Sequence, residues 1–111
     1  MADPITNSSD YAKVSGTSGV DSIVSSGNYT TITAGDGNDT ISNTNGHTSR
    51  ILGEGGNDSI YNGVNSNTAT IDGGAGDDTI ENYRSHYVKL VGGTGNDSIK
   101  NNGYSADATY L

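Results

Sequence analysis

Hydrophobic and polar positions alternate along this chain in short stretches that return about every 19 residues. Residues 39–43 show the pattern, with Asp39, Ile41 and Asn43 expected to point inward and the two residues between them outward. A period of two predicts a half-buried β-strand, and the density of glycine argues against helix. A shorter alternation, as at residues 88–90, precedes each of the later stretches. Each repeat is therefore expected to hold two short strands joined by two turns.

The repeat is defined by columns of equivalent residues. An aliphatic residue recurs seven positions before and two positions after each central aspartate, and asparagine, or once serine, recurs four positions after it. Spacing inside this segment is constant, whereas the returning connection varies in length. We therefore expect a geometrically constrained turn on one side of the repeat and an ordinary, tolerant loop on the other. The central aspartates are Asp21, Asp39, Asp58, Asp78 and Asp97.

Two architectures would accommodate these strands, an antiparallel meander or a stack of coils. The columns favour the stack, because equivalent residues of successive coils lie directly above one another. We predict an all-β fold, a right-handed parallel β-solenoid (β-roll or β-helix) of about five coils of 18–20 residues, with two short strands per coil. Residues 1–111 are expected to form a single repeat domain, a fragment of a larger repeat protein, with a truncated coil from about residue 104.

Charge and composition narrow the range of partners. The 5 basic and 13 acidic residues give a net charge of −8, which disfavours nucleic acid and anionic membranes and favours cations. The absence of cysteine excludes disulfides and thiolate metal sites, and no apolar run is long enough to span a membrane. Two aliphatic side chains per coil make a thin core, so we expect a ligand from outside the chain to stabilise the fold.

The segment that precedes each aspartate suggests the chemistry of that ligand. Residues 73–81 read Gly-Gly-Ala-Gly-Asp-Asp-Thr-Ile-Glu. Glycines permit positive φ, so a tight turn can aim several carbonyls to one side while the aspartate adds a carboxylate. An all-oxygen set suits Ca²⁺, which takes about 6–8 oxygen ligands, whereas zinc and copper prefer nitrogen or sulfur. Because one turn cannot supply so many ligands, two stacked turns are expected to share each ion.

These residues resemble the hemolysin-type calcium-binding repeat, or RTX nonapeptide, with its pattern Gly-Gly-x-Gly-x-Asp-x-aliphatic-x. Residues 73–81 and 92–100 fit the pattern fully, residues 34–42 and 53–61 fit with one or two changes, and residues 16–24 fit poorly. In that family two nonapeptides form each coil, and calcium lines both edges. Here one nonapeptide alternates with about ten other residues. The resemblance therefore implies a single row of Ca²⁺ along one edge, as in the 19-residue variants of long bacterial surface adhesins.

Carried over by position, the resemblance implies a ligand set. The carboxylate ligands would be Asp39, Asp58, Asp78 and Asp97, each shared between neighbouring coils. The carbonyl ligands would come from motif positions one, three and five, which are Ala34, Asp36, Asn38, Gly53, Gly55, Asn57, Gly73, Ala75, Asp77, Gly92, Thr94 and Asn96. Asp21 keeps the carboxylate, but Ser18 and Val20 depart from the pattern, so it is left out of the set.

The expected function is that of a calcium-binding structural spacer module in a secreted or cell-surface bacterial repeat protein. Folding is expected to be coupled to Ca²⁺ binding, and no enzymatic activity is expected. The alternative is a carbohydrate-binding module attached to a polysaccharide-modifying enzyme, with Tyr83, Arg84 and Tyr87 gripping the sugar. Because solenoid ends need caps and none is evident, end-to-end self-association is a further prediction.

Ice binding is a less favoured alternative. The resemblance implies that an ice-binding relative would present a row of threonines beside the calcium turn. The corresponding column here is broken, since it reads Ser18, Asp36, Gly55, Ala75 and Thr94.

Overall fold

The computed structural model describes residues 3–103, which form eleven short strands. Among these residues no helix is long and apolar enough to cross a membrane. The strands are β1 (Asp3–Asn7), β2 (Lys13–Ser15), β3 (Asp21–Ser25), β4 (Thr31–Thr33), β5 (Thr40–Asn43), β6 (Arg50–Leu52), β7 (Ser59–Asn62), β8 (Thr70–Asp72), β9 (Thr79–Tyr83), β10 (Lys89–Val91) and β11 (Ser98–Asn102).

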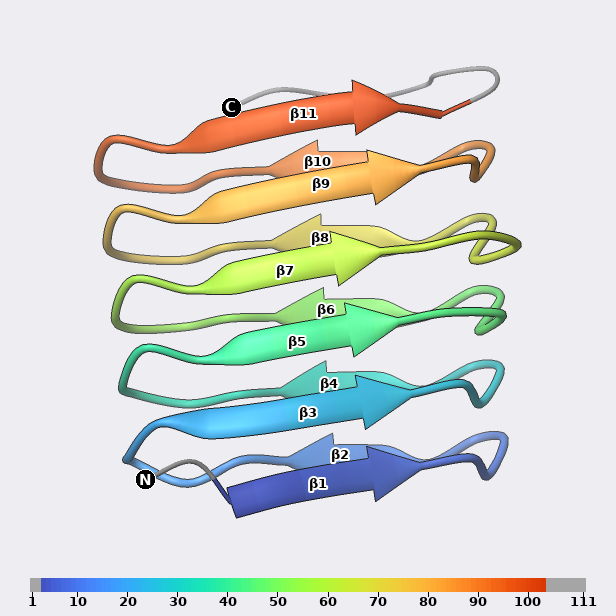
Figure 1. Cartoon of the computed structure of the whole chain (residues 1–111), viewed down its shortest axis with the longest axis horizontal. Coiled ribbons are helices and arrows are strands. Elements are labelled where there is room, and N and C mark those ends of the chain that lie inside the picture. The colour runs from blue at the N-terminus through green and yellow to red at the C-terminus, as the bar shows by residue number, and fades with distance from the viewer. Residues whose placement is uncertain (1–2, 104–111) are drawn as a thin grey trace.

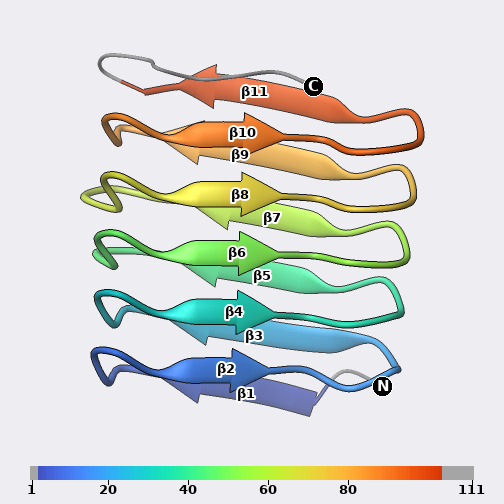
Figure 2. The same cartoon turned by 180° about the vertical axis from the view of Figure 1, so that it is seen from behind.

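The strands alternate between two parallel sheets as the chain winds. Odd-numbered strands form a six-stranded sheet, and even-numbered strands form a five-stranded sheet behind it (Figure 1). In Figure 1 the front strands run left to right, the rear strands run right to left, and the chain climbs from β1 to β11, which is a right-handed coil; Figure 2 shows the same from behind. Every pair of neighbouring strands is parallel, so the predicted right-handed parallel β-solenoid is confirmed and the meander is wrong.

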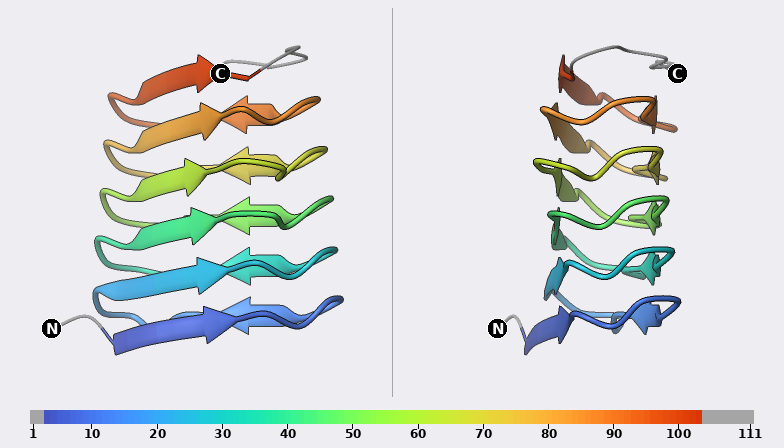
Figure 3. Two further views of the ribbon diagram at one scale, coloured as in Figure 1. Left: turned by 45° about the vertical axis from the view of Figure 1, so that its right-hand side comes forward. Right: turned by 90° about the vertical axis from the view of Figure 1, so that its right-hand side faces the viewer.

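The register stacks equivalent residues of successive coils. Two aliphatic columns, one from each sheet, face each other between the sheets and form one buried cluster. Seen edge-on, the stack is narrow, with the interior confined between the two sheets (Figure 3). The aliphatic columns predicted from spacing are therefore the core, and they are Ile23, Ile41, Ile60, Ile80 and Ile99 in one sheet and Val14, Ile32, Ile51, Ile71 and Leu90 in the other.

Strand β1 forms a half-coil that the sequence analysis missed. It pairs in register with β3, so that Asp3 lies beside Asp21. The signal for this strand is the run Asp-Pro-Ile-Thr-Asn at residues 3–7, which repeats the inward spacing of residues 39–43. The nonapeptide motif, which marks the other coils, does not include this run. The truncated coil predicted from about residue 104 lies outside the described residues.

A buried column of asparagines runs beside the isoleucines. At three successive steps the Nδ2 of one asparagine donates to the Oδ1 of the asparagine in the next coil, at 2.9 Å. The same Nδ2 groups also donate to carbonyls of the returning connection, at Gly46, Ser66 and Ser85. The column thus ties each coil to the next and each connection to its coil, and its members are Asn43, Asn62, Asn82 and Asn101.

The returning connection, expected to be an ordinary loop, is regular instead. One residue of each coil adopts a left-handed conformation there, with φ of 55° to 59°, and in four coils its amide donates to a carbonyl of the next coil. The longer connections add a second left-handed residue, Asn45, Asn65 or Arg84, which accommodates the extra length. Sequence did not reveal this order, because tyrosine and threonine rarely adopt positive φ. The recurring residues are Tyr11, Tyr29, Thr48, Thr68 and Tyr87.

Ser25 interrupts the asparagine column. It lies in register between Asn7 and Asn43, and Asn43 Oδ1 is buried without a hydrogen-bond partner. We expect Ser25→Asn to supply the missing donor and to raise the free energy of unfolding by about 1 kcal/mol. Urea unfolding in saturating Ca²⁺ measures the change, with the exposed neighbour variant Ser26→Asn as the control. Equal or lower stability of Ser25→Asn than of the control would contradict the expectation.

Candidate functional site

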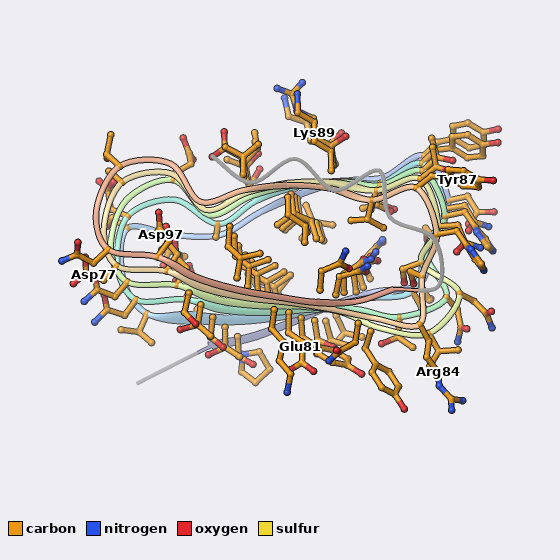
Figure 4. The ribbon with its side chains drawn as sticks, turned by 90° about the horizontal axis from the view of Figure 1, so that it is seen from above. Asp77, Glu81, Arg84, Tyr87, Lys89 and Asp97 are labelled. Carbon is orange, nitrogen blue, oxygen red and sulfur yellow. The ribbon has the colours of Figure 1, made fainter. Side chains whose placement is uncertain are left out.

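The glycine-rich turns line one edge of the stack, where each even-numbered strand leads into the next odd-numbered strand. Viewed down the stack, these turns superpose at the left, with the Asp97 side chain inside the outline of the coil and Asp77 outside it (Figure 4). Tyr87 and Arg84 mark the opposite edge. The residues of the predicted ligand set therefore lie along one edge, in turns stacked one coil above another.

Two residues with positive φ shape each of the four later turns. They occupy motif positions two and four, with φ from 73° to 117°. Position two is Glu54 in one turn, which adopts φ of 73° despite its side chain. A Cβ at Gly76 would collide with the carbonyl oxygen of Gly56 in the preceding coil. At Gly76 glycine therefore suits the backbone conformation and also permits the close stacking of one turn on the next.

The motif aspartates bridge successive coils. Oδ1 of each aspartate from the second copy onward accepts a hydrogen bond of 2.8–2.9 Å from the backbone N–H of the equivalent aspartate in the preceding coil. Asp39, Asp58 and Asp78 are 1–2% exposed, and Asp97 in the last described turn is half-buried. One oxygen of each carboxylate therefore holds the preceding coil in register.

The second oxygen of these carboxylates has no partner in the protein. Oδ2 of Asp39, Asp58 and Asp78 is buried and accepts no hydrogen bond. Asp58 Oδ2 and the carbonyl oxygen of Gly73, in the next coil, both lie close to the position that a side chain at Gly53 would take. A Cβ added at Gly53 would lie 2.5 Å from Asp58 Oδ2 and 2.6 Å from the Gly73 oxygen.

The arrangement repeats one coil further on. A Cβ added at Gly73 would lie 2.5 Å from Asp78 Oδ2 and 2.8 Å from the Gly92 oxygen. Two buried oxygens that lie near the same point require a cation or a hydrogen-bond donor, and the described residues supply no donor to Oδ2 of Asp58 or Asp78.

Burial raises the pKa of these carboxyl groups. For Asp58, loss of solvation is the main cause, repulsion from Asp39 and Asp78 adds to it, and the hydrogen bond from the Asp39 amide opposes it, which leaves a pKa of about 7. Loss of solvation likewise raises the pKa of Asp39 and Asp78. A buried carboxylate whose charge is disfavoured in this way gains strongly from a bound cation.

The donor set is made of oxygen atoms. Within residues 3–103 no group of three or more His, Cys, Asp or Glu side chains converges, so a cation at this edge would depend on backbone carbonyls plus the motif carboxylates. Carbonyls at motif position two already accept hydrogen bonds from the next coil, as Glu54 does from the Ala75 amide at 2.8 Å. No backbone hydrogen bond occupies the carbonyls at positions one and five in the turns from Ala34 to Asp77. These residues fit a hard cation such as Ca²⁺.

Comparison with protein families matches four stretches of the chain, residues 15–49, 48–69, 70–81 and 89–100, to the RTX calcium-binding nonapeptide repeat. Together the stretches cover more than half of the chain. The chain belongs to this RTX family. RTX repeats bind Ca²⁺, so the predicted family and the predicted metal are confirmed. No curated protein and no solved structure matches the chain.

The residues of the alternative carbohydrate site lie at the edge opposite the RTX turns. The Arg84 guanidinium carbon lies 5.4 Å from the centre of the Tyr83 ring, so these two side chains contact each other. Tyr87 is 61% exposed. Nothing in this arrangement distinguishes a sugar from another ligand, and the carbohydrate site stays a prediction.

The metal-free RTX module is expected to be more stable at pH 5 than at pH 7.5. Because the pKa of Asp58 rises from 3.8 to about 7 on folding, the folded state binds a proton that the unfolded chain releases between these values. The resulting stability is present at low pH and is lost as the pH rises through 7. For Asp58 alone the difference between pH 7 and pH 5 is on the order of 2 kcal/mol.

Urea unfolding after removal of Ca²⁺ on a chelating resin, followed by the far-UV β signal, measures this dependence. Asp58→Asn should weaken the dependence, because the amide does not titrate. Stability that falls between pH 7.5 and pH 5 without metal would contradict the expectation.

Proposed function

We propose that this calcium-binding module is a structural spacer of a secreted or cell-surface bacterial repeat protein and has no catalytic role. The observation that carries the proposal is the buried, unpartnered Oδ2 atom, repeated at Asp39, Asp58 and Asp78 along one edge. Left alone, these atoms oppose folding, whereas a cation beside each would bind successive coils together. Extracellular calcium lies in the concentration range at which weak sites fill, which supports a location outside the cell.

We assign one ion to each space between successive turns, beginning at the turn of Asp39. Each ion takes Oδ2 from one coil and a position-one carbonyl from the next, as Asp58 with Gly73 and Asp78 with Gly92. The carbonyls at positions three and five complete the shell. Asp97 supplies the fourth carboxylate, at the last described turn.

The free energy available from these sites supports folding that depends on calcium. At a free calcium concentration of about ten times the dissociation constant, one site adds roughly 1.4 kcal/mol, and the three sites between the four later turns add about 4 kcal/mol. That sum is comparable with the whole stability of a small domain. Because most coils bury only two large aliphatic side chains, the metal contribution is expected to supply a large share of the stability of each coil.

A spacer role follows from the way the coils are joined. Within residues 3–103, the coils are joined to the coils directly before and after them through paired strands and, in the later coils, through the asparagine and aspartate side chains. Such stacks extend in one dimension and gain length with each added repeat. Ions between the turns would add a further rigid link at every step.

Substitution of one ligand carboxylate tests the assignment. Asp78→Asn keeps the Oδ1 acceptor and places an amide where Oδ2 lies, beside the Gly92 carbonyl that it can bind. We expect this variant to bind one ion fewer per chain by isothermal titration calorimetry and to be at least as stable as the native chain without metal.

The matched control is Glu81→Gln, which removes one charge from the outer face of the same coil. It should leave the calcium stoichiometry unchanged. A native chain that binds no Ca²⁺, or an Asp78→Asn variant that keeps the native stoichiometry, would refute the assignment.

A further inference from the structure

The first turn contains the same two oxygens as the later turns. A Cβ added at Gly16 would lie 2.6 Å from Asp21 Oδ2 and would collide with the carbonyl oxygen of Ala34 in the next coil. Asp21 is 1% exposed, as deeply buried as the later aspartates. On position alone, the space between the first and second turns is equivalent to the spaces proposed to hold Ca²⁺.

Thr17 supplies hydrogen-bond donors to the carboxylate of Asp21. The Thr17 amide donates to Asp21 Oδ2 at 2.6 Å, and the Thr17 hydroxyl donates to Oδ1 at 3.0 Å and to Oδ2 at 3.2 Å. In contrast, Oδ2 of Asp39, Asp58 and Asp78 receives no donor. Asp21 therefore differs from its equivalents in hydrogen bonding and not in burial.

Backbone conformation explains the difference. In the four later turns, motif positions two and four both have positive φ, as Gly74 and Gly76 do. Neither Thr17 at position two nor Gly19 at position four has positive φ. Threonine disfavours the left-handed region, although Thr48 and Thr68 adopt it at the opposite edge. Thr17 stays outside that region, and its amide is directed at the carboxylate. The Gly19 amide donates to the Thr17 hydroxyl at 3.1 Å and holds that hydroxyl in place.

We propose that Thr17 ends the calcium row at its N-terminal side by binding Asp21 with its own amide and hydroxyl in place of a cation. The proposal rests on the proposed function of the later turns. The first turn is then complete without metal, and it presents a preformed surface on which the second coil stacks through the Asp21 amide and Asp39 Oδ1, 2.8 Å apart.

Thr17→Gly tests the proposal by gain of a site. Removal of the side chain deletes the hydroxyl donor and permits positive φ at this position, so that the amide of residue 17 can turn away from Asp21 Oδ2 as the position-two amides do in the later turns. We expect calorimetry to show one more Ca²⁺ per chain than in the native protein, and urea unfolding to show lower stability without metal. The double variant Thr17→Gly with Asp21→Asn should lose the added ion. Ser18→Gly is the matched control, since it adds a glycine to the same turn without touching Asp21, and it should keep the native stoichiometry.

Two further variants separate the outcomes. Asp21→Asn in the native background should keep the native stoichiometry, while Asp78→Asn should lose one ion. If Asp78→Asn loses an ion and Thr17→Gly gains none, the role of Thr17 is wrong and the proposed function stands. If the native chain binds no Ca²⁺, the proposed function fails. Should Thr17→Gly not fold even with Ca²⁺, Asp21→Asn alone still decides, because a lost ion in that variant overturns the proposal.

Discussion

The carboxylates of Asp58 and Asp78 each serve two coils, and the order of the turn edge depends on this shared use. One oxygen accepts the amide of the coil before, and the other faces a carbonyl of the coil after, in a space closed to water. The first contact sets the register of the stack without any ion. The second contact is unfavourable until a positive charge enters, which links the order of the edge to the presence of calcium. Stability and metal affinity therefore reside in the same atoms.

The two edges of the solenoid close the coil by different means. At the turn edge, glycines bring successive backbones close together, and polar groups are left for a cation to satisfy. At the opposite edge the polar groups pair mostly with one another. Asparagine side-chain amides donate to the next coil and to carbonyls of the connection, and backbone amides of the left-handed residues donate to carbonyls of the next coil. The narrow aliphatic core lies between these edges. A fold with so few buried apolar side chains is held largely by polar ladders. Within residues 3–103, the aspartate ladder leaves an unpartnered oxygen at Asp39, Asp58 and Asp78, whereas the asparagine ladder leaves one only at Asn43, next to Ser25.

Much of this arrangement could be predicted because a stack converts sequence period directly into spatial columns. The spacing of Ile41, Ile60 and Ile80 predicted a parallel sheet, and that of Asn43 and Asn62 predicted a side-chain ladder, since equivalent residues must lie above one another. The features that were not predicted either lack such a period or depend on residues in backbone conformations that they rarely adopt. Strand β1 lies outside the nonapeptide motifs, and the order of the returning connection depends on Tyr29 and its equivalents adopting a conformation that their side chains disfavour.

The sequence alone determined the architecture, the edge that carries the carboxylates and the kind of metal, because these follow from periodicity and from the oxygen chemistry of the motif. The tertiary structure decided how each carboxylate is used. Motif comparison marked the copy of Asp21 as deviant, but only the packed turn shows that Thr17 completes this carboxylate, whereas Oδ2 of Asp58 has no partner. The reason is physical: whether a buried oxygen is satisfied depends on the direction of a neighbouring amide, which the backbone conformation sets and residue spacing does not reveal.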